Sequence, residues 1–186
     1  GTTGAQAWGG KDAADLLPAP ASRNIVTWNP SATTPAAVAF TWTNLTSAQQ
    51  TALSASTVLD YLRGDGSNEQ TAGGAGPGVY RYRANKLGDI VNSSPLYVQS
   101  SDFGYYFSSF AGGGATYNTF VSGKSSRTPM LYVGANDGML HAFNASTGVE
   151  TFAYVPNAIY SKLKTLSSPS NSHQYYVDGP LSEGDA

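Results

Sequence analysis

Residues 131–150 have the sequence LYVGANDGMLHAFNASTGVE, and this stretch decides the fold class. Two apolar-patterned runs, 130–135 and 138–143, meet at Asn136-Asp137-Gly138. Asp-Gly between such runs is a strong hairpin signal, because the tight primed turns need a positive φ angle. A second turn at 144–148 leads into a third run, 149–155. The stretch therefore predicts three consecutive antiparallel strands, which make most of one propeller blade or one meander.

The composition agrees with a protein built from short strands and many turns. The 186 residues include 21 Gly and 12 Tyr, and charged residues are 12% of the chain, against roughly a quarter in an average soluble domain. The formal net charge of −2 provides no basic surface for nucleic acid, so we expect no such partner. The chain has no cysteine, which excludes disulfides and Cys-ligated zinc. No apolar run approaches the roughly 18 residues that a membrane-spanning helix needs.

The residues before this stretch are expected to form a helical and extended segment. Apolar residues at alternating spacings of three and four predict a helix over 45–63, with Thr46 and Gln49 as a capping box and Gly64 as its stop. Ser54 and Ser56 could divide it into two short helices. Two helical turns are expected at 11–17, and extended pieces at 24–28 and 38–42.

The remaining ranges give weaker signals. Strands are expected at 80–83, 95–98 and 173–177, and a short helix is expected after Pro156. Residues 99–123 contain seven aromatics and one charge. We interpret this range as a long loop or hairpin folded against the body, and the alternative is a prion-like segment of low complexity.

Several motifs that occur in order resemble one bacterial family. The blade at 131–150 is similar to the repeat of quinoprotein-type β-propellers. The flanking ranges 87–98, 152–156 and 176–180 resemble the C-terminal propeller of the PilY/PilC family of type IV pilus assembly and tip adhesin proteins, and 42–46 and 61–65 resemble the region before it. We therefore expect a mostly β chain that forms a partial quinoprotein-like β-propeller of about two blades.

The resemblance also implies a domain organisation. Residues 1–64 would be a pre-propeller segment that contains the helix 45–63, and residues 65–186 would be the first blades of an incomplete propeller. We expect the chain to be a fragment, because a propeller needs about four blades or more.

The function implied by the resemblance is pilus biogenesis and adhesion at the pilus tip. The implied partners are pilins or minor pilins, and the implied location is the bacterial surface, at the pilus tip or associated with the outer membrane. Family members carry calcium loops, but the Asp residues here are scattered rather than placed at alternating positions. We expect no cofactor in this chain, whereas calcium is possible in a longer member.

The tripeptide Arg63-Gly64-Asp65 has two interpretations. It can end a helix and open a turn, because glycine tolerates the left-handed backbone at a helix C-terminus. It can also act as an integrin-type receptor-binding motif. The resemblance implies this role, because integrin binding by the family is attributed to this tripeptide. If it does, Asp65→Glu should abolish cell attachment. Both interpretations stay open from the sequence.

No catalytic constellation is evident, so we expect no enzyme. His141 and His173 both lie in predicted strands and are interpreted as side chains that are either packed or satisfied by hydrogen bonds, rather than as catalytic bases. One alternative is a fragment of a quinoprotein dehydrogenase, although the chain lacks the adjacent cysteines of several such enzymes and has Phe-Ala-Tyr at 152–154 in place of the usual Trp. Another is a glycan-binding surface built on the aromatics of 103–120, including Tyr105 and Tyr106.

Overall fold

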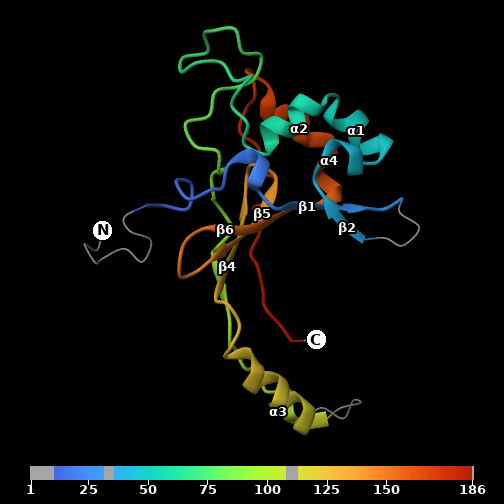
Figure 1. The fold of residues 1–186 in the computed structure, drawn as a ribbon, viewed down its shortest axis with the longest axis vertical. Coiled ribbons are helices and arrows are strands. Elements are labelled where there is room, and N and C mark those ends of the chain that lie inside the picture. Colours follow the sequence, from blue (N-terminus) through green and yellow to red (C-terminus); the bar gives the residue numbers. More distant parts are fainter. Residues whose placement is uncertain (1–10, 32–35, 108–112, 186) are drawn as a thin grey trace.

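The computed structural model of the protein describes residues 11–31, 36–107 and 113–185. Six strands form one sheet in the order β2-β1-β6-β5-β4-β3 (Figure 1). Their bounds are Ile25–Asn29 for β1, Ala36–Ala39 for β2, Leu96–Val98 for β3, Met130–Ala135 for β4, Met139–Asn144 for β5 and Glu150–Val155 for β6. The mostly β class is thereby confirmed, and all six described strands belong to a single open sheet, which fits a partial propeller.

The strands β4, β5 and β6 form the predicted antiparallel meander. The β4–β5 connection is the predicted tight hairpin, with Gly138 at a φ angle of 91°, but it is a three-residue loop over 136–138 in which Asp137 is not at a positive φ angle, rather than a primed two-residue turn. A bulge between Ala142 and Phe143 shifts the register so that Phe143 lies opposite Glu150. The sequence did not predict the other neighbour of β6, which is β1, paired parallel to it with Ile25 opposite Ala153. The segment before residue 64 and the blade therefore share one sheet.

The predicted helix over 45–63 is two helices, α1 (Ser47–Leu53) and α2 (Ser56–Leu62). The predicted capping box is present, since Thr46 and Gln49 exchange side-chain and backbone hydrogen bonds. Ser54 breaks the helix with a φ angle of 72°, which is unusual for a residue with a Cβ atom. The division at this serine is the alternative that the sequence left open.

Four sequence predictions are wrong in part or entirely. Residues 80–83 form one isolated bridge, between Tyr80 and Glu69, rather than a strand. Residues 173–177 are irregular, and 11–17 form turns only. The range 99–123 contains a 3-10 helix, Tyr105–Phe107 (η3), and most of the helix α3 (Gly113–Lys124). Glycines and a lack of hydrophobic periodicity hid this helix, although 108–112 lie outside the described residues.

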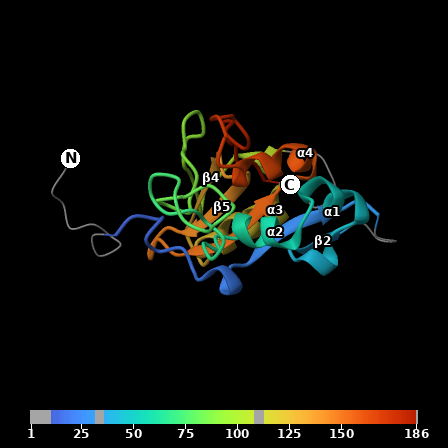
Figure 2. The same cartoon turned by 90° about the horizontal axis from the view of Figure 1, so that it is seen from above.

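The hydrophobic core lies on one face of the sheet, under α1, α2 and α4 (Tyr160–Leu163) (Figures 1 and 2). Short 3-10 helices, Asn157–Ile159 (η4) and Lys164–Ser167 (η5), flank α4, where the helix after Pro156 was predicted. Two further 3-10 helices are Pro20–Ser22 (η1) and Trp42–Asn44 (η2). The core side chains come from β1, β5, β6 and these helices: Ile25, Phe40, Leu45, Leu53, Val58, Leu59, Tyr61, Leu62, Met139, Ala153, Val155, Tyr160, Leu163 and Leu166.

The opposite face of the sheet is also apolar. Strand alternation and register place one set of residues on it: Val26, Trp28, Ala37, Ala39, Leu96, Val98, Met130, Tyr132, Gly134, Leu140, Ala142, Phe152 and Tyr154, with Asn144 as the polar member. Most of them are partly or largely exposed, and Trp28 is 39% exposed. Because solvated sheet faces are normally polar, this "outer face" has the composition of a surface that packs against another sheet.

Candidate functional site

The tripeptide Arg63-Gly64-Asp65 lies directly after α2. Gly64 has a φ angle of 108°, and its N–H donates to the Tyr61 carbonyl oxygen at 2.9 Å. Glycine adopts this backbone conformation without steric cost, so Gly64 ends the helix as predicted. The Asp65 carboxylate accepts a hydrogen bond from the Ser67 N–H at 2.8 Å, and this bond lowers the pKa of Asp65. Asp65 is therefore an ionised, partly exposed carboxylate.

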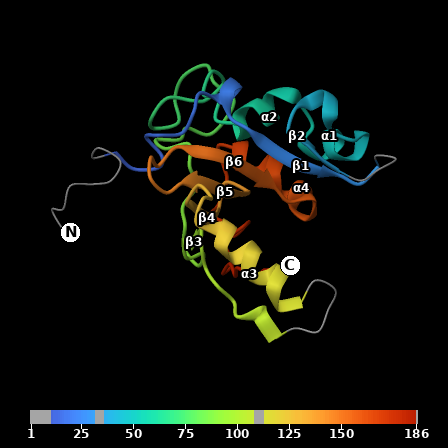
Figure 3. The same cartoon turned by 60° about the horizontal axis from the view of Figure 1, so that its bottom comes forward.

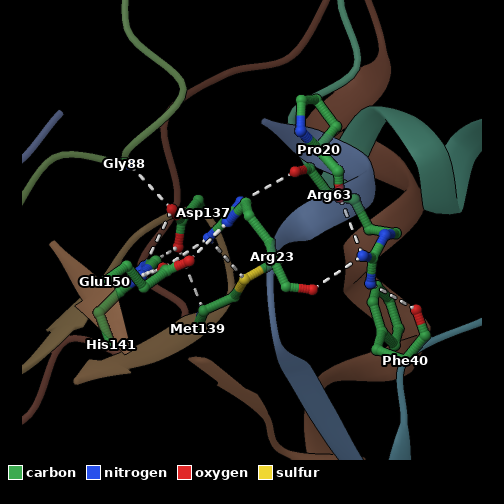
Figure 4. Close-up of polar contacts among 9 residues, drawn as sticks. All are labelled: Pro20, Arg23, Phe40, Arg63, Gly88, Asp137, Met139, His141 and Glu150. Carbon is green, nitrogen blue, oxygen red and sulfur yellow. Dashed lines mark hydrogen bonds and ion pairs between the residues drawn. The ribbon is translucent and has the colours of Figure 1, made fainter. Parts of the chain in front are cut away.

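The Arg63 side chain turns inward from this position (Figure 4). Its guanidinium donates to three carbonyl oxygens, those of Phe40 at 3.0 Å and of Pro20 and Arg23 at 2.9 Å each. These carbonyls belong to the chain on either side of the β1–β2 hairpin. Arg63 thus fixes the end of α2 to that hairpin, while the receptor contact of the tripeptide remains a prediction.

Arg23, just before β1, connects Arg63 to the blade. Its Nη1 donates to the Arg63 carbonyl oxygen at 3.0 Å. Its Nε and Nη2 donate to the two carboxylate oxygens of Glu150, both at 2.7 Å. The Arg23 and Glu150 side chains are only 2% and 1% exposed. This fork-to-fork geometry is the strongest form of ion pair available to a carboxylate.

His141 extends the same contacts across β5. Its Nδ1 lies 2.8 Å from Glu150 Oε1, and its Nε2 lies 3.1 Å from both carboxylate oxygens of Asp137. Asp137 also accepts hydrogen bonds from the backbone N–H groups of Gly88 at 3.0 Å and Met139 at 3.2 Å. We call Arg23, Asp137, His141 and Glu150 the ionic network (Figure 4).

The charges of the ionic network balance only when His141 is protonated. Burial lowers the pKa of His141, but Asp137 and Glu150 outweigh burial and raise it to about 9. Burial raises the pKa of each acid, yet His141, together with Arg23, holds the pKa of both Asp137 and Glu150 below its ordinary range. Two buried cations therefore neutralise two buried anions, which is the condition for burying such charges without a large penalty.

The ionic network does not have the properties of a catalytic site. Both ring nitrogens of His141 are hydrogen-bonded to carboxylates and the ring is fully buried, as the sequence predicted. A general base needs a nitrogen within reach of a substrate proton. The ionic network instead links three parts of the chain: the segment before β1 through Arg23, the β4–β5 turn through Asp137, and the start of β6 through Glu150.

His173 is hydrogen-bonded, which is one of the two predicted alternatives, but it is not packed. It lies in an irregular segment with its side chain 52% exposed, and its Nε2 is 2.7 Å from Asp89 Oδ2. It is thus a surface residue rather than a packed one. The expected burial depended on a strand at 173–177, which does not form.

A second polar cluster joins two of the motifs that carried the family resemblance. Asp178 Oδ1 accepts hydrogen bonds from the backbone N–H groups of Val91, Asn92 and Ser93 at 2.9–3.1 Å. Asp178 Oδ2 accepts from the side-chain amides of Asn92 at 3.0 Å and Asn136 at 3.4 Å. Burial raises the pKa of Asp178, but these donors outweigh it and lower that pKa. The ordered motifs are therefore parts of one hydrogen-bonded unit beside β4.

Sequence reasoning missed Arg23, Asp137, Glu150 and Asp178 as interacting residues. The signal that could have found them is scarcity, since only 22 residues of the chain are Lys, Arg, Asp or Glu. A charged residue at the end of an apolar strand in such a chain needs a buried partner. Which partner it has could not be read from the sequence, because Arg23 and Glu150 are 127 positions apart.

Within the described ranges, no group of three or more His, Cys, Asp and Glu side chains is arranged to hold a metal ion. The same ranges contain no helix whose length and apolar character would suffice to cross a bilayer. Calcium binding by a longer member of the family stays a prediction.

Comparisons with known proteins agree with the motifs. The family described as the PilY1 beta-propeller domain matches residues 87–185. A type IV pilus biogenesis factor PilY1 homolog of Xylella fastidiosa is 46% identical over 138 residues, which cover 73% of this chain and 11% of that protein. The type IV pilus biogenesis factor PilY1 of Pseudomonas aeruginosa strain UCBPP-PA14 is 35% identical over 100% of this chain and 16% of its own length.

The protein of the same name from Pseudomonas aeruginosa strain PAK is 38% identical over 79% of this chain and 13% of that protein. The chain thus spans less than a fifth of the length of these curated relatives. No solved structure matches it.

Proposed function

The chain belongs to the PilY1 family, and from this we propose that it acts in type IV pilus biogenesis through binding and assembly, without chemistry of its own. Its partners would be pilins or minor pilins, and its place the bacterial surface at the pilus. The names of the relatives and the saturated hydrogen bonding of His141 support this proposal. The single observation that carries the assembly role is the outer face of the sheet.

The outer face suits packing against another β-sheet. It presents large side chains such as Trp28, Tyr132 and Tyr154 beside small ones such as Ala37 and Ala39, a pattern that interdigitates when sheets stack. Tyr132 and Phe152 already contact each other, with ring centroids 6.2 Å apart. In a propeller, neighbouring blades supply such a second sheet. We propose that the outer face packs against a neighbouring blade in the full-length protein and that this packing is needed for the protein to act in pilus assembly.

Lysines on the outer face should abolish pilus assembly. In a piliated bacterium that carries the full-length protein, Trp28→Lys combined with Tyr132→Lys should reduce surface pili and twitching motility at least tenfold, because two charges would be buried between sheets without partners. The control is Val149→Lys, since Val149 is 40% exposed in the β5–β6 turn. Immunoblots would compare protein levels. Normal piliation in the double variant would contradict the packing role.

Adhesion is the second part of the proposal, and Asp65 is the residue that would make the receptor contact. Its carboxylate is ionised and partly exposed. Asp65 also lines a pocket of about 300 Å³, together with Ala19, Pro20, Ala21, Asp60 and Arg63. The guanidinium of Arg63 is occupied by three carbonyls. Arg63 variants would therefore alter the fold as well as any receptor contact, and they cannot test adhesion cleanly.

Replacing Asp65 with glutamate should abolish attachment to integrin-expressing cells while leaving the melting temperature unchanged. The longer side chain moves the carboxylate away from its place on the turn, whereas the charge is kept. Asp60→Glu is the matched control, because Asp60 lines the same pocket and is exposed. Cell attachment and thermal unfolding would be measured on the same preparations. Attachment equal to that of the unchanged protein would rule out the receptor contact.

A further inference from the structure

The connection between β3 and β4 is much longer than a hairpin turn. It runs over residues 99–129, whereas hairpin loops usually have about two to five residues. We call it the aromatic arm. It extends from the body along the long axis of the molecule, with α3 at the end opposite α1 and α2 (Figure 1). Long connections of this kind often carry function.

The aromatic arm has a small core of its own, centred on Tyr117. Tyr117 is 8% exposed, and its ring lies 5.5 Å from that of Tyr105 and 6.1 Å from that of Phe120, between centroids. Its hydroxyl accepts from the Phe103 N–H at 3.0 Å and donates to Asp185 Oδ2 at 2.9 Å. These contacts hold the rings in place before any ligand arrives.

A buried cation completes this core. Lys124 is fully buried, and its ammonium group donates to Asp185 Oδ1 at 2.6 Å and to the Ser101 carbonyl oxygen. The same group lies 5.0 Å and 5.6 Å from the centroids of the Phe103 and Phe120 rings. The segment that contains Asp185 runs beside α3 (Figure 3). The positive charge of Lys124 is thus paired inside the arm and does not face solvent.

The solvent side of the arm presents rings and one carboxylate. Tyr105 and Phe120 are 38% and 37% exposed, and they flank the buried Tyr117. Asp102 is exposed, and its carboxylate accepts from the Gly104 N–H at 2.9 Å and from the Tyr106 hydroxyl. The bond to Asp102 raises the pKa of Tyr106 to about 12. Two partly exposed rings and a fixed hydrogen-bond acceptor therefore all contact the buried Tyr117.

The composition of the arm discriminates between classes of ligand. Single-stranded nucleic acid stacks on such rings only beside a positively charged groove, and the arm has two cations, of which Lys124 is buried. Protein interfaces are centred on a contiguous apolar core, but residues 99–129 contain no Leu, Ile or Met and are rich in Ser, Thr and Gly. Rings that are apolar on their faces, set among hydroxyls and a carboxylate, match a ligand that is itself apolar on one face and hydroxylated at its edges.

We propose that the aromatic arm binds a neutral glycan, whose sugar rings stack on Tyr105 and Phe120 and whose hydroxyls donate to Asp102. Tyr106 is a positioning residue, because it holds the Asp102 carboxylate. The site is separate from Asp65 and from the outer face, so it stands independently of the proposed function.

Affinity electrophoresis of the full chain tests this site, with hydroxyethyl cellulose, galactomannan or soluble starch in the gel. We expect at least one of these polysaccharides to retard the protein. Tyr105→Ala and Phe120→Ser should each weaken the retardation at least tenfold, and Tyr106→Phe should weaken it several-fold with an unchanged melting temperature. Tyr175→Ala is the control and should have no effect, since Tyr175 is 59% exposed and lies outside the arm.

Three results would overturn the proposal. One is the absence of retardation by all three polysaccharides. Another is an equal loss in Tyr175→Ala, which would indicate unspecific contact by tyrosines. The third is that oligothymidine or an unstructured peptide binds more tightly than the glycans do and that the same arm variants lose this binding. Thermal unfolding of each variant separates loss of the site from loss of the fold.

Discussion

Arg23→Leu is expected to lower the free energy of unfolding by about 3–5 kcal/mol, the usual cost of removing one partner of a buried ion pair. Arg23 and Glu150 are almost completely buried. Without the guanidinium, Asp137 and Glu150 would share a single positive charge, that of His141, and one net negative charge would remain in the interior. The Arg63 carbonyl oxygen would also lose the hydrogen bond that it accepts from Arg23.

Urea denaturation followed by circular dichroism measures this loss. Arg127→Leu serves as the control, because Arg127 is exposed in the aromatic arm and should change stability by well under 1 kcal/mol. The double variant Arg23→Leu/Glu150→Leu should recover part of the loss, since His141 and Asp137 would then balance each other. If the double variant recovers nothing, the loss comes from packing and the charge argument is wrong.

The second large effect is a loss of stability as the pH rises from 6.5 to 9. The pKa of His141 is about 9 in the folded protein, against 6.5 for a histidine in the unfolded chain. A group whose pKa is raised by folding contributes its full stabilisation below the unfolded value and loses it as the pH passes the folded value. A difference of this size corresponds to roughly 3 kcal/mol.

The acids of the ionic network act in the opposite direction. Folding lowers the pKa of Asp137 and of Glu150, so their stabilisation is present above about pH 4 and is lost as the pH falls. The network should therefore contribute most between about pH 5 and 6.5. Urea midpoints measured across this range check the prediction. His173→Gln should keep the same profile, because His173 is exposed. A flat profile between pH 6.5 and 9 would show that His141 is not charged in the native state.

Local signals predicted those parts of the fold that depend on local backbone preferences. The Asp137-Gly138 turn, the capping box at Thr46 and the stop at Gly64 are all observed. Each depends on contacts between residues that are close in sequence. The wrong strands, at 80–83 and 173–177, lie in ranges held by distant hydrogen bonds instead, such as the bond from the Arg81 N–H to the Ser167 carbonyl oxygen at 2.9 Å.

The candidate site was predictable only in part for the same reason. The tripeptide 63–65 and the buried state of His141 could be inferred from residue type and position. The inward direction of Arg63 could not, because its acceptors are carbonyls of Pro20, Arg23 and Phe40. In the aromatic arm, α3 was missed because its stability depends on the rings of Tyr105 and Tyr106 and on Asp185.

By itself, the sequence determined the three-stranded meander, the turns, the helix end at Gly64 and, through the order of its motifs, the PilY1 family. Turn chemistry and strand alternation act over a few residues, so they can be read along the chain. Only the tertiary structure decided that β1 joins β6, that Arg23 pairs with Glu150, 127 positions later in the chain, and that both faces of the sheet are apolar. These features depend on which distant segments contact each other. The free energy gained when such segments are buried together depends on both partners, so it cannot be read from either segment alone.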